Sequence, residues 1–205
     1  MGSSTTTTAR LEAFSDGVFA VAITLLVLQL VVPEVGRGKL AGALLDQWPV
    51  LASYVASFAT IGVIWLNHHR LISYVGRVDR TLHALNLLLL LWIVLIPYPT
   101  ALVGHYLQVG HDASVATTAY AIVMTAMSAA FGSMWLYVTG RPGLLREGVD
   151  VDAAKRTRWR FAGGGLVYLA SIGLAWLSPL LVLVLYAVAA IYYAFDQLTV
   201  PERAA

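Results

Sequence analysis

The sequence predicts an all-α membrane protein that crosses the bilayer six times, because long uncharged stretches recur along a very apolar chain. Of its 205 residues, 59% are hydrophobic and only 12% are charged. A water-soluble domain could not bury so much apolar surface. A helix rises ~1.5 Å per residue, so about 20 residues cross a hydrocarbon core of ~30 Å. The predicted spans are 11–32, 48–72, 80–104, 114–138, 159–178 and 180–198.

The positions of Lys and Arg predict the orientation of these spans. If the N-terminus is inside, eleven Lys and Arg residues fall on cytoplasmic segments, and only Arg37 and Lys39 fall on an outer loop. Short loops rich in Lys and Arg stay in the cytoplasm. We therefore expect a multi-pass protein of the plasma membrane with both termini cytoplasmic. The expected divisions are a disordered N-terminus at 1–9, a transmembrane domain at 10–198 and a cytoplasmic tail at 199–205.

The first span has two different faces. Val21, Leu25 and Leu28 recur at helical spacing and form an aliphatic row, with Thr24 on its flank. Lipid contact, helix packing and the lining of a pore would all produce such a row. Asp16 points nearly the opposite way, and an acid inside a membrane is costly unless it has a partner. We expect it either to cap the start of the helix or to join a polar network.

Prolines and tryptophans mark the boundaries of the later spans. Pro33 ends the first span, and Trp48 begins the second at a water interface, where Trp is favoured. Pro97 and Pro99 bend or end the third span near its outer side. The fifth and sixth spans are separated only at Ser178 and Pro179, which predicts a tight helical hairpin.

Polar residues of the first three spans are expected at one depth near the cytoplasmic face. Asp16, His69 and Asn86 lie at comparable distances from that face, with Ser15 and Trp65 nearby. In a medium of low dielectric constant such groups need one another, and a satisfied network fixes how helices assemble.

The two adjacent histidines raise the question of metal binding or proton transfer. His68 and His69 diverge by ~100° on a helix, so they cannot easily face one metal ion, and no metal site is expected. A proton relay through His69 and Asp16 remains an alternative, because His titrates near neutrality. The chain has no cysteine, and no motif of a phosphate loop, serine hydrolase or zinc protease is present. We therefore expect neither an enzyme nor a cofactor.

The largest polar loop ends in a basic segment from Lys155 to Arg160 that includes Trp159. Beside a membrane helix, such a segment favours contact with anionic lipid rather than with nucleic acid.

The residues of the first span resemble a known family. Arg10, Phe14, Ser15 and Asp16, followed by GVFAVAITLLVL, are similar to the first-helix signature of the potassium channel family typified by the endolysosomal channel, in its shorter prokaryotic branch. The segment WLNHHR at 65–70 and the region of Asn86 also resemble that family. The likeness covers the first three spans, and the later spans match in number and length.

This resemblance implies a homotetramer in which the first helices line a central pore for potassium ions. Rings of branched aliphatic side chains would select the ion, with a hydroxyl layer nearby. Counted from Asp16, the rings fall on Val21, Leu25 and Leu28, and Thr24 supplies the hydroxyl. The family usually has Ile or Leu where Val21 stands. A proton-coupled transporter and a non-transporting scaffold are the competing functions. The network that would hold the first helix comprises Arg10, Phe14, Ser15, Asp16, Trp65, His69 and Asn86.

Overall fold

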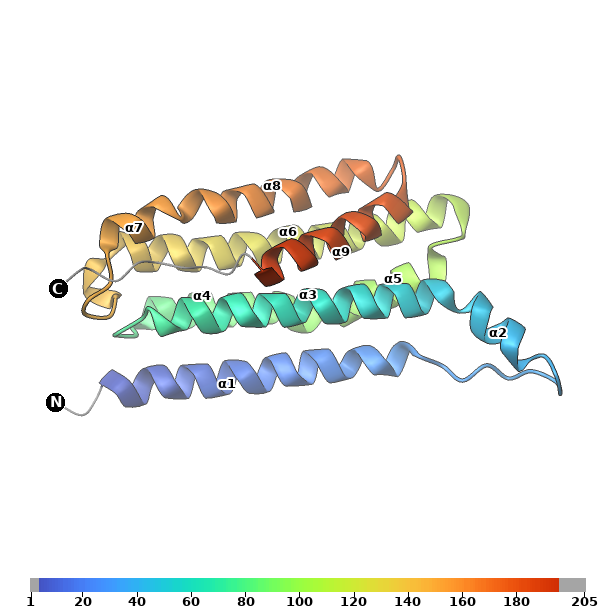
Figure 1. Cartoon of the computed structure of the whole chain (residues 1–205), viewed down its shortest axis with the longest axis horizontal. Helices are drawn as coiled ribbons and strands as arrows, with labels where there is room; N and C mark the ends of the chain where they lie inside the picture. The colour runs from blue at the N-terminus through green and yellow to red at the C-terminus, as the bar shows by residue number, and fades with distance from the viewer. Residues whose placement is uncertain (1–3, 196–205) are drawn as a thin grey trace.

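The protein is an elongated bundle of helices that run nearly along one direction (Figure 1). The computed structural model describes residues 4–195, without the side chains of residues 4–7 and 160–162. The predicted tail at 199–205 and the end of the sixth predicted span lie outside the described residues. The elements are α1 (Ser4–Leu25), η1 (Leu26–Gln29), α2 (Leu40–Asp46), α3 (Trp48–Ser73), α4 (Arg80–Leu95), α5 (Pro97–Tyr106), α6 (Gly110–Gly140), η2 (Pro142–Leu144), α7 (Val151–Arg156), α8 (Arg158–Leu174) and α9 (Pro179–Phe195).

Four helices of the described chain are long and apolar enough to cross a membrane. They are Thr8–Gln29, Trp48–Ser73, Arg80–Tyr106 and Gly110–Gly140, which correspond to the first four predicted spans. The places of the fifth and sixth spans are taken by α8 and α9, which have 17 residues each within the described range. The molecule is thus an all-helical membrane protein with four long apolar helices and shorter ones beside them.

The first helix differs from its predicted bounds at both ends. It begins at Ser4, within the segment 1–9 that was expected to be disordered. The α-helix ends at Leu25, and a 3-10 turn continues it to Gln29 instead of Val32. Gln29 explains this end, because its Nε2 donates to the carbonyl oxygen of Pro97 at 2.9 Å. The long side chain thereby ties the C-terminal end of the first helix to the break in the third span.

That break lies where the prolines predicted it, between α4 and α5. Pro97 has no N–H and cannot complete the helical hydrogen bond to Ile93. The amide of Ile96 donates to the Ile93 carbonyl at 3.1 Å, and the Thr100 hydroxyl donates to the Ile96 carbonyl at 2.7 Å. The two helices therefore continue as one span with a local change of hydrogen bonding.

Backbone pairing and a carboxylate hold α3, α4 and α6 together at the end of the bundle where α1 begins (Figure 1). The Gly76 amide donates to the Leu144 carbonyl at 2.8 Å, and a Cβ at Gly76 would lie 2.9 Å from the Arg146 Cα. Only glycine fits this approach without a shift. Asp79 caps α4, accepts the Tyr137 hydroxyl at 2.6 Å and accepts the Leu82 amide at 2.8 Å. These two hydrogen bonds, the one from Tyr137 first, lower the pKa of the Asp79 carboxyl.

Candidate functional site

One face of α1 packs against the rest of the protomer, chiefly against α3 and α4. Phe19, Ala22 and Leu26 are at most 1% exposed. Together with the buried Leu11 and Ser15 they recur at intervals of three or four residues, which is the spacing of a single helix face. This face fixes the rotation of α1 about its own axis.

The predicted aliphatic row lies on the other side of α1 and is uncovered in the protomer. Val21 is 53% exposed, Leu25 is 37% exposed and Leu28 is 72% exposed. Thr24 is exposed between them, and its hydroxyl donates to the Val21 carbonyl at 2.9 Å. That bond uses the hydroxyl hydrogen within the helix, so the oxygen is left as an acceptor. In Figure 1, α1 lies at one edge of the bundle, with the other long helices on one side of it.

A buried chain of hydrogen bonds joins three helices behind this face. His68 Nε2 donates to Asn86 Oδ1 at 2.8 Å, Asn86 Nδ2 donates to Ser15 Oγ at 3.0 Å, and Ser15 Oγ donates to the Leu11 carbonyl at 2.8 Å. Ser15, His68 and Asn86 are all 0% exposed. The Asn86 amide group donates to Ser15, so its Oδ1 faces His68 and can only accept. His68 must therefore carry a hydrogen on Nε2. His68 Nδ1 has no partner within the described part of the chain.

The histidine that joins the buried chain of hydrogen bonds is His68 and not His69, which corrects the prediction. The inward face of α3 carries Ile61, Ile64, His68 and Leu71, and the next residue is turned ~100° away. The His69 side chain is 55% exposed, and its Nδ1 lies 2.8 Å from Glu12 Oε1. The apolar spacing of α3 already carries the signal for His68, since three aliphatic residues at helical intervals place it on the buried face.

Asp16 has a partner, as the cost of a membrane acid predicts, but that partner lies apart from the buried chain. Trp65 Nε1 donates to Asp16 Oδ1 at 2.8 Å, and the Trp65 ring lies 6.0 Å from the His69 ring. Asp16 does not cap the helix, because α1 begins twelve residues earlier, at Ser4. The pair is a second link between α1 and α3 on the more exposed flank.

The remaining members of the predicted network lie elsewhere. Arg10 and Phe14 are exposed on α1, away from the buried chain. The seven predicted residues therefore do not form one network. Ser15 is linked to Asn86, Asp16 is linked to Trp65, and His69 lies beside Glu12, while the other two are exposed. No group of three His, Asp or Glu side chains that could hold a metal ion occurs among the described residues.

Comparison with known proteins finds one family and close relatives. Residues 10–97 match the family described as endosomal/lysosomal potassium channel TMEM175. Potassium channel B446_29190 of Streptomyces collinus is 48% identical over 197 residues, which are 96% of each chain. A crystal structure of a lysosomal potassium-selective channel TMEM175 homolog from Chamaesiphon minutus superposes with a TM-score of 0.84 at 36% identity, over 93% of this chain and 98% of that one.

A vertebrate relative is similar over a smaller part. The endosomal/lysosomal proton channel TMEM175 of Gallus gallus is 35% identical over 147 residues, which are 67% of this chain and 28% of the relative. The likeness to bacterial relatives thus extends over nearly the whole chain, and the likeness to this vertebrate relative covers about a quarter of that protein.

Proposed function

Because the chain belongs to the endosomal/lysosomal potassium channel TMEM175 family, we propose that it is a potassium channel that conducts along the uncovered face of α1. The observation that carries the proposal is the row of Val21, Leu25 and Leu28, which remains 37–72% exposed although the opposite face of the same helix is fully packed. Within the described part of the chain, all three side chains keep a substantial exposed area.

The proposed assembly is a homotetramer that brings four copies of this row around one axis. Closed cyclic symmetry is the usual arrangement of identical subunits, and it would bury the row against its own copies. In this arrangement α8 and α9 complete six membrane crossings, and both termini lie in the cytoplasm. The excess of Lys and Arg on the cytoplasmic segments supports that topology.

Selection of potassium follows from the apolar character of the proposed neck. Rings of Val21, Leu25 and Leu28 offer no charge, so an ion passes only if it sheds part of its water. Potassium holds its hydration shell less tightly than sodium and passes at lower cost. Thr24 places an acceptor oxygen between these rings. A narrow apolar neck also closes by dewetting. The hydrogen bonds behind α1 keep the helix at a set rotation, so that the row faces the axis.

The direct test is ion flux into liposomes that contain the purified protein. We expect potassium flux above sodium flux, and Leu25→Asn should change the potassium-to-sodium ratio, because it places an amide in the neck. Val188→Asn is a matched control on the outward side of α9, where Val188 is 57% exposed. Equal behaviour of Leu25→Asn and the unmutated protein would remove the α1 row from the pathway.

Proton conduction is the second candidate, favoured by the name of the vertebrate relative. The buried chain ends at the Leu11 carbonyl, and His68 Nδ1 has no partner within the described residues. At neither end do the described residues continue the hydrogen bonds, so this chain does not form a proton path across the membrane. A pH-sensitive dye inside the liposomes measures proton entry. If the protein is a pore, His69→Gln should leave potassium flux and proton entry unchanged. If His69 belongs to a proton relay, the same change should abolish transport.

The basic segment from Lys155 to Arg160 is proposed to contact anionic lipid at the cytoplasmic surface. Lys155 and Arg156 are exposed on α7, and a positive juxtamembrane segment is attracted to a negative leaflet. This contact would help to set the depth at which α8 enters the membrane.

A further inference from the structure

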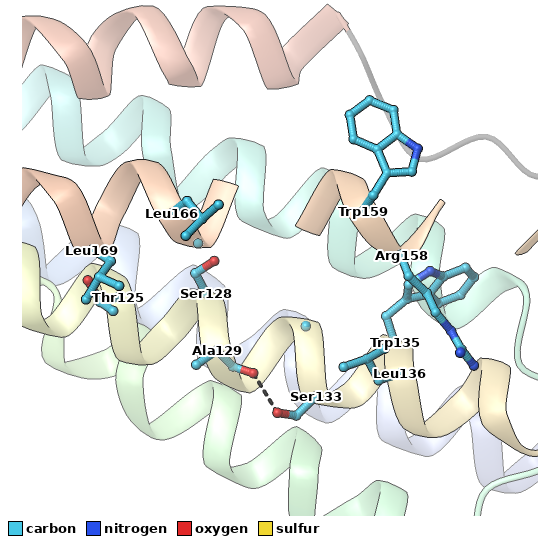
Figure 2. A pocket seen from close by; sticks show the side chains of 12 residues that line it. Thr125, Ser128, Ala129, Ser133, Trp135, Leu136, Arg158, Trp159, Leu166 and Leu169 are labelled. Atoms are coloured by element: carbon cyan, nitrogen blue, oxygen red, sulfur yellow. Dashed lines mark hydrogen bonds between the residues drawn. The ribbon is translucent and has the colours of Figure 1, made fainter. Parts of the chain in front are cut away.

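A groove of about 630 Å³ runs between α6 and α8, on the side of the bundle away from α1 (Figure 1). This volume lies within the range of ~300–1,000 Å³ that is usual for small-molecule sites. Small residues of the two helices form its floor, and leucines form its walls. Figure 2 shows Thr125 and Leu169 at one end, Ser128, Ala129 and Ser133 along the middle, and Leu136, Trp135 and Arg158 at the other end.

The groove has the length of one lipid leaflet. Its α6 side extends from Thr125 to Leu136, which at ~1.5 Å per residue is about 16 Å. That is roughly half of a hydrocarbon core of ~30 Å. The end at Leu136 lies near the cytoplasmic end of α6, which finishes at Gly140. The groove therefore covers the cytoplasmic half of the membrane and stops near its middle.

The walls of the groove are chemically apolar despite their hydroxyl groups. Thr125 Oγ1 donates to the Ala121 carbonyl at 2.7 Å, and Ser133 Oγ donates to the Ala129 carbonyl at 2.7 Å. Both hydroxyl hydrogens are used within α6, so these residues need no polar ligand. Of the three hydroxyl residues in the lining, Thr125, Ser128 and Ser133, these two can contact a hydrocarbon chain without leaving an unpaired donor.

The cytoplasmic end of the groove is positively charged and aromatic. Arg158 Nε donates to Thr139 Oγ1 at 2.8 Å, which holds the guanidinium at this end. Trp159 is 71% exposed beside it. Lys155 and Arg156 precede it on α7, where Lys155 Nζ also lies 3.7 Å from the exposed Asp152 carboxylate. Tryptophan and basic residues together are typical of the level of lipid head groups.

We propose that this groove binds an anionic phospholipid of the cytoplasmic leaflet, with one acyl chain between α6 and α8 and the phosphate beside Arg158, Lys155 and Arg156. The leaflet length, the apolar lining and the positive end together specify this occupant, since the choline cation of a zwitterionic lipid offsets the attraction of its phosphate to the basic end. The site adds an acyl-chain pocket to the surface contact proposed above. It is independent of the conduction pathway, which is assigned to the opposite side of the bundle.

The test measures lipid binding to the delipidated full chain in detergent by native mass spectrometry. Dioleoylphosphatidylglycerol should bind more tightly than dioleoylphosphatidylcholine. Ala129→Phe should lower the affinity for both lipids by about tenfold, because the ring fills the groove, and this is a change of ~1.4 kcal/mol. Val184→Phe, at a 51% exposed position of α9, is the control for size and should bind as the unmutated protein does.

A second variant tests the charge and does not touch the packing. Lys155→Gln with Arg156→Gln should lower the affinity for phosphatidylglycerol by about tenfold and leave the affinity for phosphatidylcholine unchanged. Arg37→Gln with Lys39→Gln removes two charges from the outer loop and should not change the affinity for either lipid. Glycerophosphoglycerol, which carries the head group without acyl chains, should not displace the lipid.

Three results would overturn the proposal. One is unchanged phosphatidylglycerol binding in both groove and charge variants. Another is displacement by glycerophosphoglycerol alone, which would assign the site to a free phosphate ester. The last is a loss of subunit assembly in Ala129→Phe, measured as the oligomer mass, which would assign the groove to a neighbouring copy of the chain.

Discussion

The two faces of α1 differ in what the protomer supplies to them. On one face, Ser15 joins a buried chain of hydrogen bonds, and Phe19 and Ala22 are fully packed. On the other, Val21 and Leu28 are more than half exposed within the described part of the chain. Polar groups are thus enclosed and large apolar groups are left outside, as expected for a helix in a membrane, where an unpaired polar group is costly and an exposed apolar side chain is not.

Attachment and exposure are therefore separate properties of this one helix. Two hydrogen bonds, from Asn86 to Ser15 and from Trp65 to Asp16, and a packed stripe hold α1 to α3 and α4. The uncovered face contributes nothing to that attachment, so its residues are free to serve contact with ions, lipid or other copies. Four measurements of unfolding in detergent, taken from the largest expected loss to the smallest, test the separation.

Asn86→Leu should cause the largest loss of stability. It removes the acceptor of His68 Nε2–H and the donor to Ser15, and each orphaned buried group costs ~1–3 kcal/mol. Leu87→Ala on the same helix, where Leu87 is 55% exposed, is the control and should change little. Combining Asn86→Leu with His68→Leu should cost less than the sum of the two single changes, because the partners then leave together. Additive losses would mean that the two residues are not coupled.

Asp16→Ala should have the next largest effect. Trp65 Nε1–H loses its acceptor, but Trp65 is 37% exposed and polar neighbours recover part of the loss, so about 1 kcal/mol is expected. Asp16→Asn keeps an acceptor oxygen in place and should restore most of the stability. If Asp16→Ala unfolds at the same temperature as the unmutated protein, the Asp16 pair does not help to attach α1.

Asp79 provides a polar contact outside α1 for comparison. Its pKa is lowered in the folded protein, first by the Tyr137 hydroxyl and then by the Leu82 amide. The contribution is therefore present above the ordinary Asp pKa of 3.8 and is lost as the pH falls through the lowered value. Asp79→Asn should remove this pH dependence and keep a capping oxygen, whereas Asp79→Ala should also lose the helix cap, at a cost of about 1 kcal/mol. Tyr137→Phe should reduce the pH dependence; an unaltered profile in Tyr137→Phe would contradict the order of causes.

Leu28→Asn should have the smallest effect on unfolding, within about 0.5 kcal/mol, because Leu28 is 72% exposed in the protomer. Leu26→Asn, two residues away at a fully buried position, is the matched change on the covered face and should be strongly destabilising. Ion flux reverses the ranking, since Leu28→Asn should alter conductance although the protomer remains stable. Similar unfolding of the two variants would end the distinction between the faces.

Prediction from sequence succeeded where the signal was local. The prolines of the third span, the apolar row on the first helix and the need of Asp16 for a partner were all read from neighbouring residues, and the structure has each of them. The prediction placed His69 in the network because its depth in the membrane matches that of Asn86. A contact also depends on the rotation of the helix about its axis, which depth does not give. The rotation of α3 turns His68 inward instead. Glu12 as the partner of His69 was likewise missed.

The class of the protein was established from the sequence, because apolar length reports directly on the transfer of each helix into a bilayer. The family was established in the same way, through residues close together on the first helix. The folded structure was needed to show which histidine meets Asn86, why Gly76 lies against Arg146, and where α6 and α8 leave a groove. Each of these depends on how two helices are rotated and spaced, and a shift of one residue, ~100° on a helix, changes the answer.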